Sequence, residues 1–418
     1  MILRQPQYKK KMYLLLTLAY MLIGTFSYAQ YTKLLDFVGA ANGRAPSGSL
    51  ISDGTFLYGM TYSGGANNLG TVFKIMPDGT GYVNLLDFAG ATNGSNPHGS
   101  LISDGTFLYG MTGTGGANNL GTIFKIMPDG TGYAKLLDFA GTTNGSNPYG
   151  SLISDGIFLY GMTYSGGANN LGTVFKIMPN GTGYLNLLDF AGATNGRYPR
   201  GSLISDGTFL YGMTYMGGTN SIGTIFKMMP DGSGYVKLLD FVAPTNGCFP
   251  RGSLIYDGTF LYGMAQQSGT NNLGTIFKIM TDGTGYVKLL DFAGTTNGSN
   301  PYGSLIYDGA FLYGMTQQGG TSNFGVVFKF ANATVGINNY LSDIDVTIYP
   351  NPTTGIINIS TSFNGVQFGS VTNILGEIIL NKEINLVAGT PFTIDISNQP
   401  SGIYLLRLGN SIKRIIRQ

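Results

Sequence analysis

A repeat of constant length constrains the fold of this chain more than any other feature. The tetrapeptide Leu-Leu-Asp-Phe occurs six times, and each occurrence begins 51 residues after the one before it, at Leu34, Leu85, Leu136, Leu187, Leu238 and Leu289. No insertion or deletion interrupts this spacing. Copies of one sequence fold into copies of one structural unit, and such units bury their apolar faces by packing on their neighbours. The repeat therefore predicts an array of equal units.

Each copy predicts four β segments. In the second copy they are YVNLLDF (82–88), GSLIS (99–103), TFLYGMT (106–112) and GTIFKIM (121–127). These segments are rich in aromatic and β-branched residues, and Gly, Asp, Asn and Pro separate them. Two connections are tight turns, Asp104-Gly105 and PDGTG (128–132), and the other two are longer loops.

Four antiparallel strands in about 50 residues are typical of one blade of a β-propeller. The low content of charged residues (11%) and the 66 glycines also favour turn-rich β structure over helices. A β-solenoid is the alternative, but its rungs are usually half as long or shorter. The sequence therefore predicts an all-β chain with a six-bladed β-propeller over residues 30–335.

The two ends of the repeat region predict how the ring closes. After GVVFKF (325–330) the repeat pattern stops, so the sixth copy lacks a following Leu-Leu-Asp-Phe strand. The N-terminus has a spare strand of this type, YTKLLDF (31–37). If this strand completes the last blade, no sheet edge stays open.

Differences between the copies indicate a candidate ligand-binding face. In an up-and-down blade the tight turns share one face of the ring and the longer loops share the other, and most differences fall in the longer loops. Tyr and Arg are enriched at recognition sites, and binding residues collect on loops of rigid scaffolds. The candidate residues are Tyr62, Tyr149, Tyr164, Tyr198, Tyr215, Tyr302, Arg44, Arg197, Arg200, Arg251, Gln266 and Gln317. We expect a glycan or a protein as the ligand, and neutral drift in exposed loops is the alternative.

The repeats resemble the tandem repeat family called GloVer. The resemblance rests on GTVFKIMPDGTGY (70–82) together with the LLDF and LYGMT segments. It implies an exported bacterial protein, and it implies no established chemistry.

The last eighty residues resemble the type A C-terminal sorting domain of the type IX secretion system. The matching residues are Tyr349, Pro350, Asn351, Pro352, Gly355, Gly402, Tyr404, Lys413 and Arg414. Alternating strands such as GIINIS (355–360) predict a small Ig-like β-sandwich over residues 336–418. The resemblance implies that the outer-membrane translocon and its sorting protease act on this segment. The protein is then attached to the cell surface or released.

The N-terminus predicts a signal peptide over residues 1–29. Basic residues precede an apolar run (12–26), and small residues follow it, so we expect cleavage between Ala29 and Gln30. The apolar run has 15 residues, fewer than the ~20 that a membrane-spanning helix needs. We therefore expect a secreted or outer-surface protein that passes through the periplasm.

The sequence offers little material for catalysis. His98 is the only histidine and Cys248 the only cysteine, so we expect neither a catalytic triad nor a disulfide within the chain. The repeat region has no Glu, and its 16 Asp residues fall on three repeated positions that suit turns. We predict a monomeric, non-catalytic binding or adhesion protein without metal, cofactor or nucleic acid. The alternatives are a glycan-active hydrolase or lyase on the variable loop face, and a passive surface-coat protein.

Overall fold

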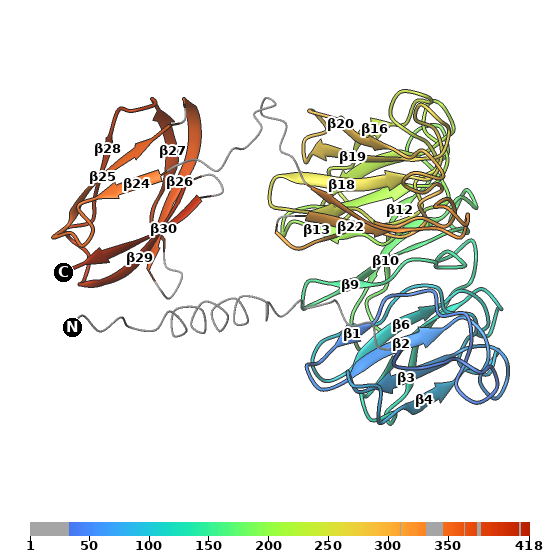
Figure 1. The fold of residues 1–418 in the computed structure, drawn as a ribbon. Coiled ribbons are helices and arrows are strands. Elements are labelled where there is room, and N and C mark those ends of the chain that lie inside the picture. Colours follow the sequence, from blue (N-terminus) through green and yellow to red (C-terminus); the bar gives the residue numbers. More distant parts are fainter. Residues whose placement is uncertain (1–32, 310, 332–345, 363, 374–377, 409–410) are drawn as a thin grey trace, which may run out of the picture. The chain divides into compact units, whose positions relative to one another are not determined.

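The computed structural model describes residues 33–309, 311–331, 346–362, 364–373, 378–408 and 411–418. These residues form strands, turns and loops, and no helix among them is long and apolar enough to cross a membrane. The chain divides into two compact units, residues 1–332 and 333–418 (Figure 1). The predicted signal peptide and its cleavage site at Ala29 and Gln30 lie outside the described residues.

The first unit begins with five antiparallel sheets of four strands each, and each sheet follows chain order. The first three are β1 (Ile51–Ser52), β2 (Leu57–Thr61), β3 (Thr71–Ile75) and β4 (Val83–Asp87); β5 (Ile102–Ser103), β6 (Leu108–Thr112), β7 (Thr122–Ile126) and β8 (Ala134–Asp138); and β9 (Ile153–Ser154), β10 (Leu159–Thr163), β11 (Thr173–Ile177) and β12 (Leu185–Asp189). The next two are β13 (Ile204–Ser205), β14 (Leu210–Thr214), β15 (Thr224–Met228) and β16 (Val236–Asp240); and β17 (Ile255–Tyr256), β18 (Phe260–Ala265), β19 (Thr275–Met280) and β20 (Val287–Asp291). The predicted all-β class with repeated four-stranded sheets is confirmed.

The apolar core lies between consecutive sheets. Tyr58 and Met60 on the first sheet pack with Leu108 and Phe124 on the second, and the equivalent residues repeat this cluster at the following junctions. An edge-to-face pair of phenylalanines belongs to each cluster, such as Phe88 and Phe124, whose ring centres are 5.5 Å apart. The second to fifth sheets are therefore covered on both faces, which explains why their strands are apolar on both sides.

A second set of contacts joins the innermost segments of neighbouring copies. The Ser49 N–H donates to the Ser100 Oγ at 2.7 Å, and the same bond links each serine to its equivalent 51 residues further on, as far as Ser304. A side chain on Gly48 would collide with the backbone of Gly99, so this position requires glycine. These contacts reduce the predicted strand over 99–103 to the two residues of β5.

The sixth sheet has three strands: β21 (Ile306–Tyr307), β22 (Phe311–Met315) and β23 (Val327–Ala331). Val327 is 79% exposed, whereas the equivalent Ile276 is fully buried. Leu50 in the first copy is 50% exposed, whereas the equivalent Leu101 is 1% exposed. The last and first sheets therefore lack the packing that joins the other neighbours.

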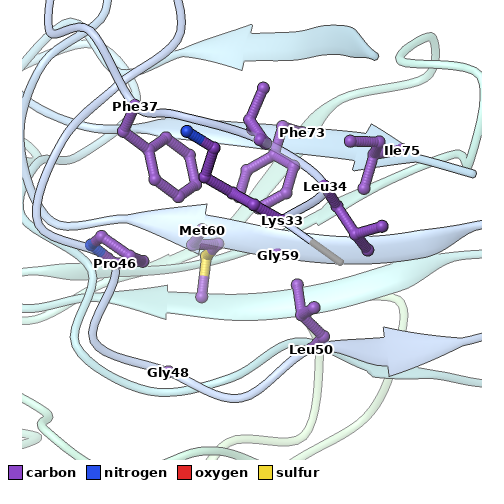
Figure 2. A pocket seen from close by; sticks show the side chains of 11 residues that line it. Lys33, Leu34, Phe37, Pro46, Gly48, Leu50, Gly59, Met60, Phe73 and Ile75 are labelled. Carbon is purple, nitrogen blue, oxygen red and sulfur yellow. The ribbon is translucent and has the colours of Figure 1, made fainter. Parts of the chain in front are cut away.

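The predicted closing strand over 31–37 does not pair with β23 in the described part of the chain. Residues 31 and 32 lie outside the described residues, and 33–37 have no strand hydrogen bonding. The segment nevertheless packs on the first sheet, because the Phe37 and Phe73 ring centres are 5.4 Å apart. Its repeat equivalents pack in the same way on the sheets that follow them, as Phe88 does on Phe124. Figure 2 shows Leu34 and Phe37 beside Phe73, with a cavity of about 380 Å³ that Leu50 also lines. Closure of a six-bladed ring stays a prediction.

The second unit is a sandwich of two antiparallel sheets. One contains β24 (Val346–Tyr349), β25 (Ile356–Thr361) and β28 (Phe392–Asp395). The other has the order β27 (Ile378–Leu386), β26 (Gly365–Asn373), β29 (Gly402–Leu408) and β30 (Ser411–Arg417). Buried side chains from both sheets, including Ile357 and Leu406, form one core, as predicted.

Candidate functional site

The six sheets of the first unit surround a cavity of about 1010 Å³, which we call the axial cavity. The innermost Gly-Ser segments of all six copies line it. The residue before each of these glycines also lines it, and it differs between copies: Ser47, His98, Tyr149, Arg200, Arg251 and Tyr302. The constant segments therefore fix the backbone, and the residue before each of them sets the chemistry of the wall.

Aromatic side chains from successive copies contact one another, and two of them, His98 and Tyr149, line the cavity. Ring centres lie 4.8 Å apart for Tyr62 and His98, 4.5 Å for His98 and Tyr149, and 4.9 Å for Tyr149 and Tyr164. Tyr164 then stacks on Tyr198 at 5.0 Å. Each tyrosine of a second loop lies beside the first loop of the next copy, so the contacts run from copy to copy.

Arg200 lies among three tyrosine rings. Its Cζ is 4.6 Å from the ring centre of Tyr215, 5.0 Å from that of Tyr164 and 5.6 Å from that of Tyr149, distances at which a guanidinium and a ring attract. Its Nε is buried and has no hydrogen-bond partner.

Arg251 continues the network in the next copy. Its Cζ is 4.0 Å from the ring centre of Tyr302 and 5.0 Å from that of Tyr215. Its Nε donates to the Gln266 Oε1 at 2.7 Å, and the Gln266 Nε2 donates to the Tyr302 hydroxyl at 3.3 Å. Arg251 and Gln266 are therefore held in fixed orientations at the wall.

The wall of the axial cavity carries positive charge. No Asp or Glu is among the residues that line it. Burial, together with the charge of Arg200, lowers the pKa of His98 to about 4, so this imidazole is neutral at pH 7. The net charge at the wall is then that of the two arginines.

Two aromatic residues near the wall have an unfavourable backbone conformation. Tyr198 and Phe249 both have φ of 58°, in the left-handed region. Three other copies have asparagine at this position, which tolerates that region better. Phe249 contacts Tyr215 at 5.3 Å, as Tyr198 contacts Tyr164.

The structure brings together most of the candidate residues. Ten of them share the network of ring, cation–π and hydrogen-bond contacts: Tyr62, Tyr149, Tyr164, Tyr198, Tyr215, Tyr302, Arg197, Arg200, Arg251 and Gln266. Gln317 lines the cavity, and Arg197 lies 5.6 Å from the Tyr198 ring centre. Arg44 is not among the lining residues, and its Nε donates to the Ser63 Oγ at 3.0 Å.

Sequence reasoning missed two members of the network, His98 and Phe249. The repeat itself contained the signal, because His98 occupies the position of Tyr149 and Arg200, and Phe249 occupies that of Tyr198. These two residues were not candidates, because the candidates were restricted to Tyr, Arg and Gln.

In the second unit, the Tyr349–Pro352 segment is bonded to the last strand. The Asn351 Nδ2 donates to the carbonyl of Arg414 at 2.6 Å, and its Oδ1 accepts from the Ile416 N–H at 2.8 Å. The Tyr404 side chain is buried, and its hydroxyl donates to the carbonyl of Pro400 at 2.7 Å. Asn351 of the sorting motif thus holds β30 in place.

The remaining motif residues of this unit divide into exposed and packed ones. Tyr349, Lys413 and Arg414 are exposed. Gly355 packs against Ser397, where a side chain would collide, whereas Gly402 has open space around its Cα. Arg417, which the sequence did not single out, donates from its Nε to the carbonyl of Ile396 at 3.0 Å.

Comparison with known families identifies both parts of the chain. The model described as "Gloeobacter/Verrucomicrobia repeat" matches residues 23–126, 102–235 and 204–379. The chain belongs to this repeat family. The "Secretion system C-terminal sorting domain" matches residues 347–418. The protein is therefore exported by type IX secretion to the cell surface or the extracellular space, and it interacts with that machinery.

Solved structures of propeller-like proteins resemble the chain in fold alone. A xyloglucanase from Xanthomonas campestris has a TM-score of 0.48 and 12% identity over 75% of this chain and 50% of its own. A putative TolB from Agrobacterium tumefaciens has a TM-score of 0.40 and 14% identity over 69% and 89%. An oligogalacturonate lyase in complex with manganese has a TM-score of 0.45 and 11% identity over 72% and 79%. No curated protein matches the chain significantly in sequence.

Proposed function

We propose that this exported protein is a non-catalytic binding protein that recognises a glycan in the axial cavity. The observation that carries the proposal is the network of aromatic, guanidinium and amide groups from successive copies around one cavity. These groups occupy positions where the copies differ, within segments that are otherwise constant.

The shape and chemistry of the cavity suit a sugar chain better than a protein surface. A volume of about 1010 Å³ is near the upper end of small-ligand sites, whereas stable protein interfaces are broad and flatter. Tyrosine rings offer flat apolar faces for the C–H surfaces of sugar rings. The amide of Gln317 and the guanidinium groups, which line the cavity, offer hydrogen bonds to hydroxyl groups.

The backbone at Tyr198 and Phe249 supports a binding role over neutral drift. A left-handed conformation costs about 1–2 kcal/mol for residues other than Gly, Asn and Asp. Such strain is concentrated at functional sites. Drift offers no reason for large aromatic residues to occupy the two strained positions beside Tyr164 and Tyr215.

The lining residues support binding over catalysis. Glycan hydrolysis uses a pair of carboxyl groups on either side of the scissile bond. The lining of the axial cavity contains no Asp or Glu, and the pKa of His98 is far below neutrality. We further propose that the sorting protease removes the second unit after export and leaves the repeat unit at the cell surface.

The test is a glycan-array screen of the full chain and of a Tyr164→Gly/Tyr215→Gln double variant. Both new residues already occur at the same repeat position, as Gly113 and Gln266, so we expect the variant to fold. The proposal predicts glycan binding that the variant loses. Equal binding by both proteins, or binding of no glycan by either, contradicts it; in the latter case a passive coat becomes the better account.

A further inference from the structure

We infer that the axial cavity binds an anionic glycan, whose carboxylate or sulfate groups pair with Arg200 and Arg251. This inference rests on the proposed glycan site and names the class of its ligand. It depends on the charges around the cavity, on the orientation of the two arginines, and on the pairing of the acidic residues near them.

Among the residues that the structure describes, the two arginines have no acidic partner. No Asp or Glu is among the residues that line the axial cavity, and neither arginine takes part in an ion pair that the structure describes. The Arg200 Nε is buried and has no hydrogen-bond partner. The Arg200 side chain as a whole is partly exposed and lines the cavity, so its terminal N–H groups can meet a bound anion there.

The acidic residues on the same face of the sheets have other partners. Asp138, Asp240 and Asp291 form ion pairs of 2.6–2.8 Å with the lysines three residues before them. The Asp138 Oδ1 also accepts the Ala117 N–H. These carboxylates are fixed to their own strands and loops, so the balancing anion must come from a ligand.

The tyrosine rings leave the guanidinium edges available. Arg200 and Arg251 lie at 4.6 and 5.0 Å from the ring centre of the same residue, Tyr215. The Arg251 Nε is bonded to Gln266 and the Arg200 Nε is buried, so the terminal Nη groups are the ones that can bind a carboxylate or sulfate, and a guanidinium binds such groups in pairs. Two such groups on adjacent copies suit a polymer with acidic groups at regular intervals.

An acidic peptide has the same charge, but the wall favours a glycan. Tyr149 and Tyr302 line the cavity beside the two arginines, and tyrosine rings suit contact with sugar rings. A peptide would instead require partners for its backbone N–H and C=O groups. An acidic peptide is therefore an outcome of the test.

The test is calorimetric titration of the full chain with four probes. These are a uronic acid oligosaccharide, the same oligosaccharide with its carboxyl groups reduced to alcohols, a sulfated neutral oligosaccharide, and oligoglutamate. The main variant is Arg200→Ser, which introduces the residue of the first copy, Ser47. The control is Lys135→Asn, which removes the same charge and introduces the residue found at Asn84 and Asn186.

We expect the uronic acid or the sulfated oligosaccharide to bind, and the two probes identify which acid is recognised. If the uronic acid oligosaccharide binds, its carboxyl-reduced form should bind at least about tenfold more weakly. Arg200→Ser should weaken binding by about ten- to hundredfold, because hydrogen bonds to charged groups are strong. Lys135→Asn should leave the affinity unchanged.

The pKa of His98 provides an independent measurement of binding, because His98 is the only histidine of the chain. Burial and the charge of Arg200 lower its pKa to about 4, so we expect its NMR signal to titrate near that pH in the free protein. An anion bound at Arg200 should raise that pKa, and the carboxyl-reduced form should not.

Three results would overturn the inference, and they differ in what they leave standing. Equal binding of the neutral and acidic oligosaccharides, unaffected by Arg200→Ser, leaves a glycan site without charge selection. Binding of no oligosaccharide removes the proposed function as well. Binding of oligoglutamate alone replaces the glycan with an acidic peptide.

Discussion

At the scale of single residues, one repeated position has a left-handed backbone conformation, which costs free energy in most residues and favours asparagine. Ala45, Asn96, Asn147, Tyr198, Phe249 and Asn300 are equivalent, and all have φ between 52° and 58°. Asparagine tolerates this region better than most residues, and Asn147 also donates from its Nδ2 to the carbonyl of Gly113 in the preceding copy at 2.9 Å. Ala45 has the cost without a ring contact that would offset it.

The substitution Ala45→Asn should therefore stabilise the protein by about 1 kcal/mol. The converse change, Asn147→Ala, should destabilise it by about the same amount or slightly more, since it also removes a hydrogen bond. Chemical denaturation of the three proteins measures both effects. If Ala45→Asn has no effect or lowers stability, the conformational account of this position is wrong.

The sequence predicted the candidate residues better than their contacts. Tyr, Arg and Gln in variable loops were recognisable as types, and ten of the twelve share one network. The pairing of Tyr62 with His98 was not predictable, because it joins loops of adjacent copies. Such contacts depend on how far one sheet is rotated against the next, which residue types do not specify.

At the scale of elements, the hairpin between the first two strands of each sheet is stabilised by an Asp–Tyr pair. The Asp104 Oδ1 accepts the N–H groups of Thr106 and Phe107, and its Oδ2 accepts the Tyr109 hydroxyl at 2.7 Å. All six copies contain the Asp–Tyr bond. Burial, together with the carboxylate of Asp104, raises the pKa of Tyr109 above its ordinary value of 10.0.

This pair predicts how stability changes in alkali. A group whose pKa is higher in the folded than in the unfolded protein contributes stability below the unfolded value, and this is lost as the pH rises above it. Tyr109→Phe should cost about 1–2 kcal/mol at neutral pH, and the cost should shrink above pH 10. Denaturation of both proteins at several pH values tests this. A cost that is constant with pH would contradict the role given to the hydroxyl.

The sequence located most strands and mislocated their ends where contacts between copies intervene. The predicted segments 106–112 and 121–127 correspond to β6 and β7 within two residues at each end. The segment 99–103 became the two-residue β5, because its first residues bond to the neighbouring copies. The Asp-Gly turn was predictable from local preference, but the tyrosine that bonds to its Asp was not.

At the scale of the whole molecule, the junction of the last and first sheets is the open question of the fold. In the first sheet Val72 pairs with Leu86. The same register in the last sheet would pair Val327 with Leu35, which lies on the N-terminal segment. If the N-terminal segment pairs in this way, its side chains would cover Leu50 and Val327, which are exposed in the structure.

We predict that the cysteines of Leu35→Cys/Val327→Cys form a disulfide within one chain when Cys248 is replaced by serine, the residue of three other copies. Antiparallel partners lie close enough for such a bond. Mobility on a non-reducing gel and the mass of the oxidised chain measure it. Val38→Cys/Val327→Cys is the matched control, because Val38 is out of register.

A bond between two chains, or no bond in either variant, would contradict ring closure. The sequence alone cannot decide this point, since closure joins segments almost 300 residues apart. A contact between segments so far apart in the chain leaves no signal in any short stretch of the sequence. The export route, by contrast, was predictable because the residues of the sorting domain lie within one segment.

The most direct test of the central claim is a crystal structure of the full chain with the oligosaccharide that the array selects. The account predicts sugar density in the axial cavity, with rings against Tyr164 and Tyr215 and an acidic group at the Arg200 guanidinium. Sugar bound at the tight-turn face or on the second unit, with the axial cavity empty, would contradict it.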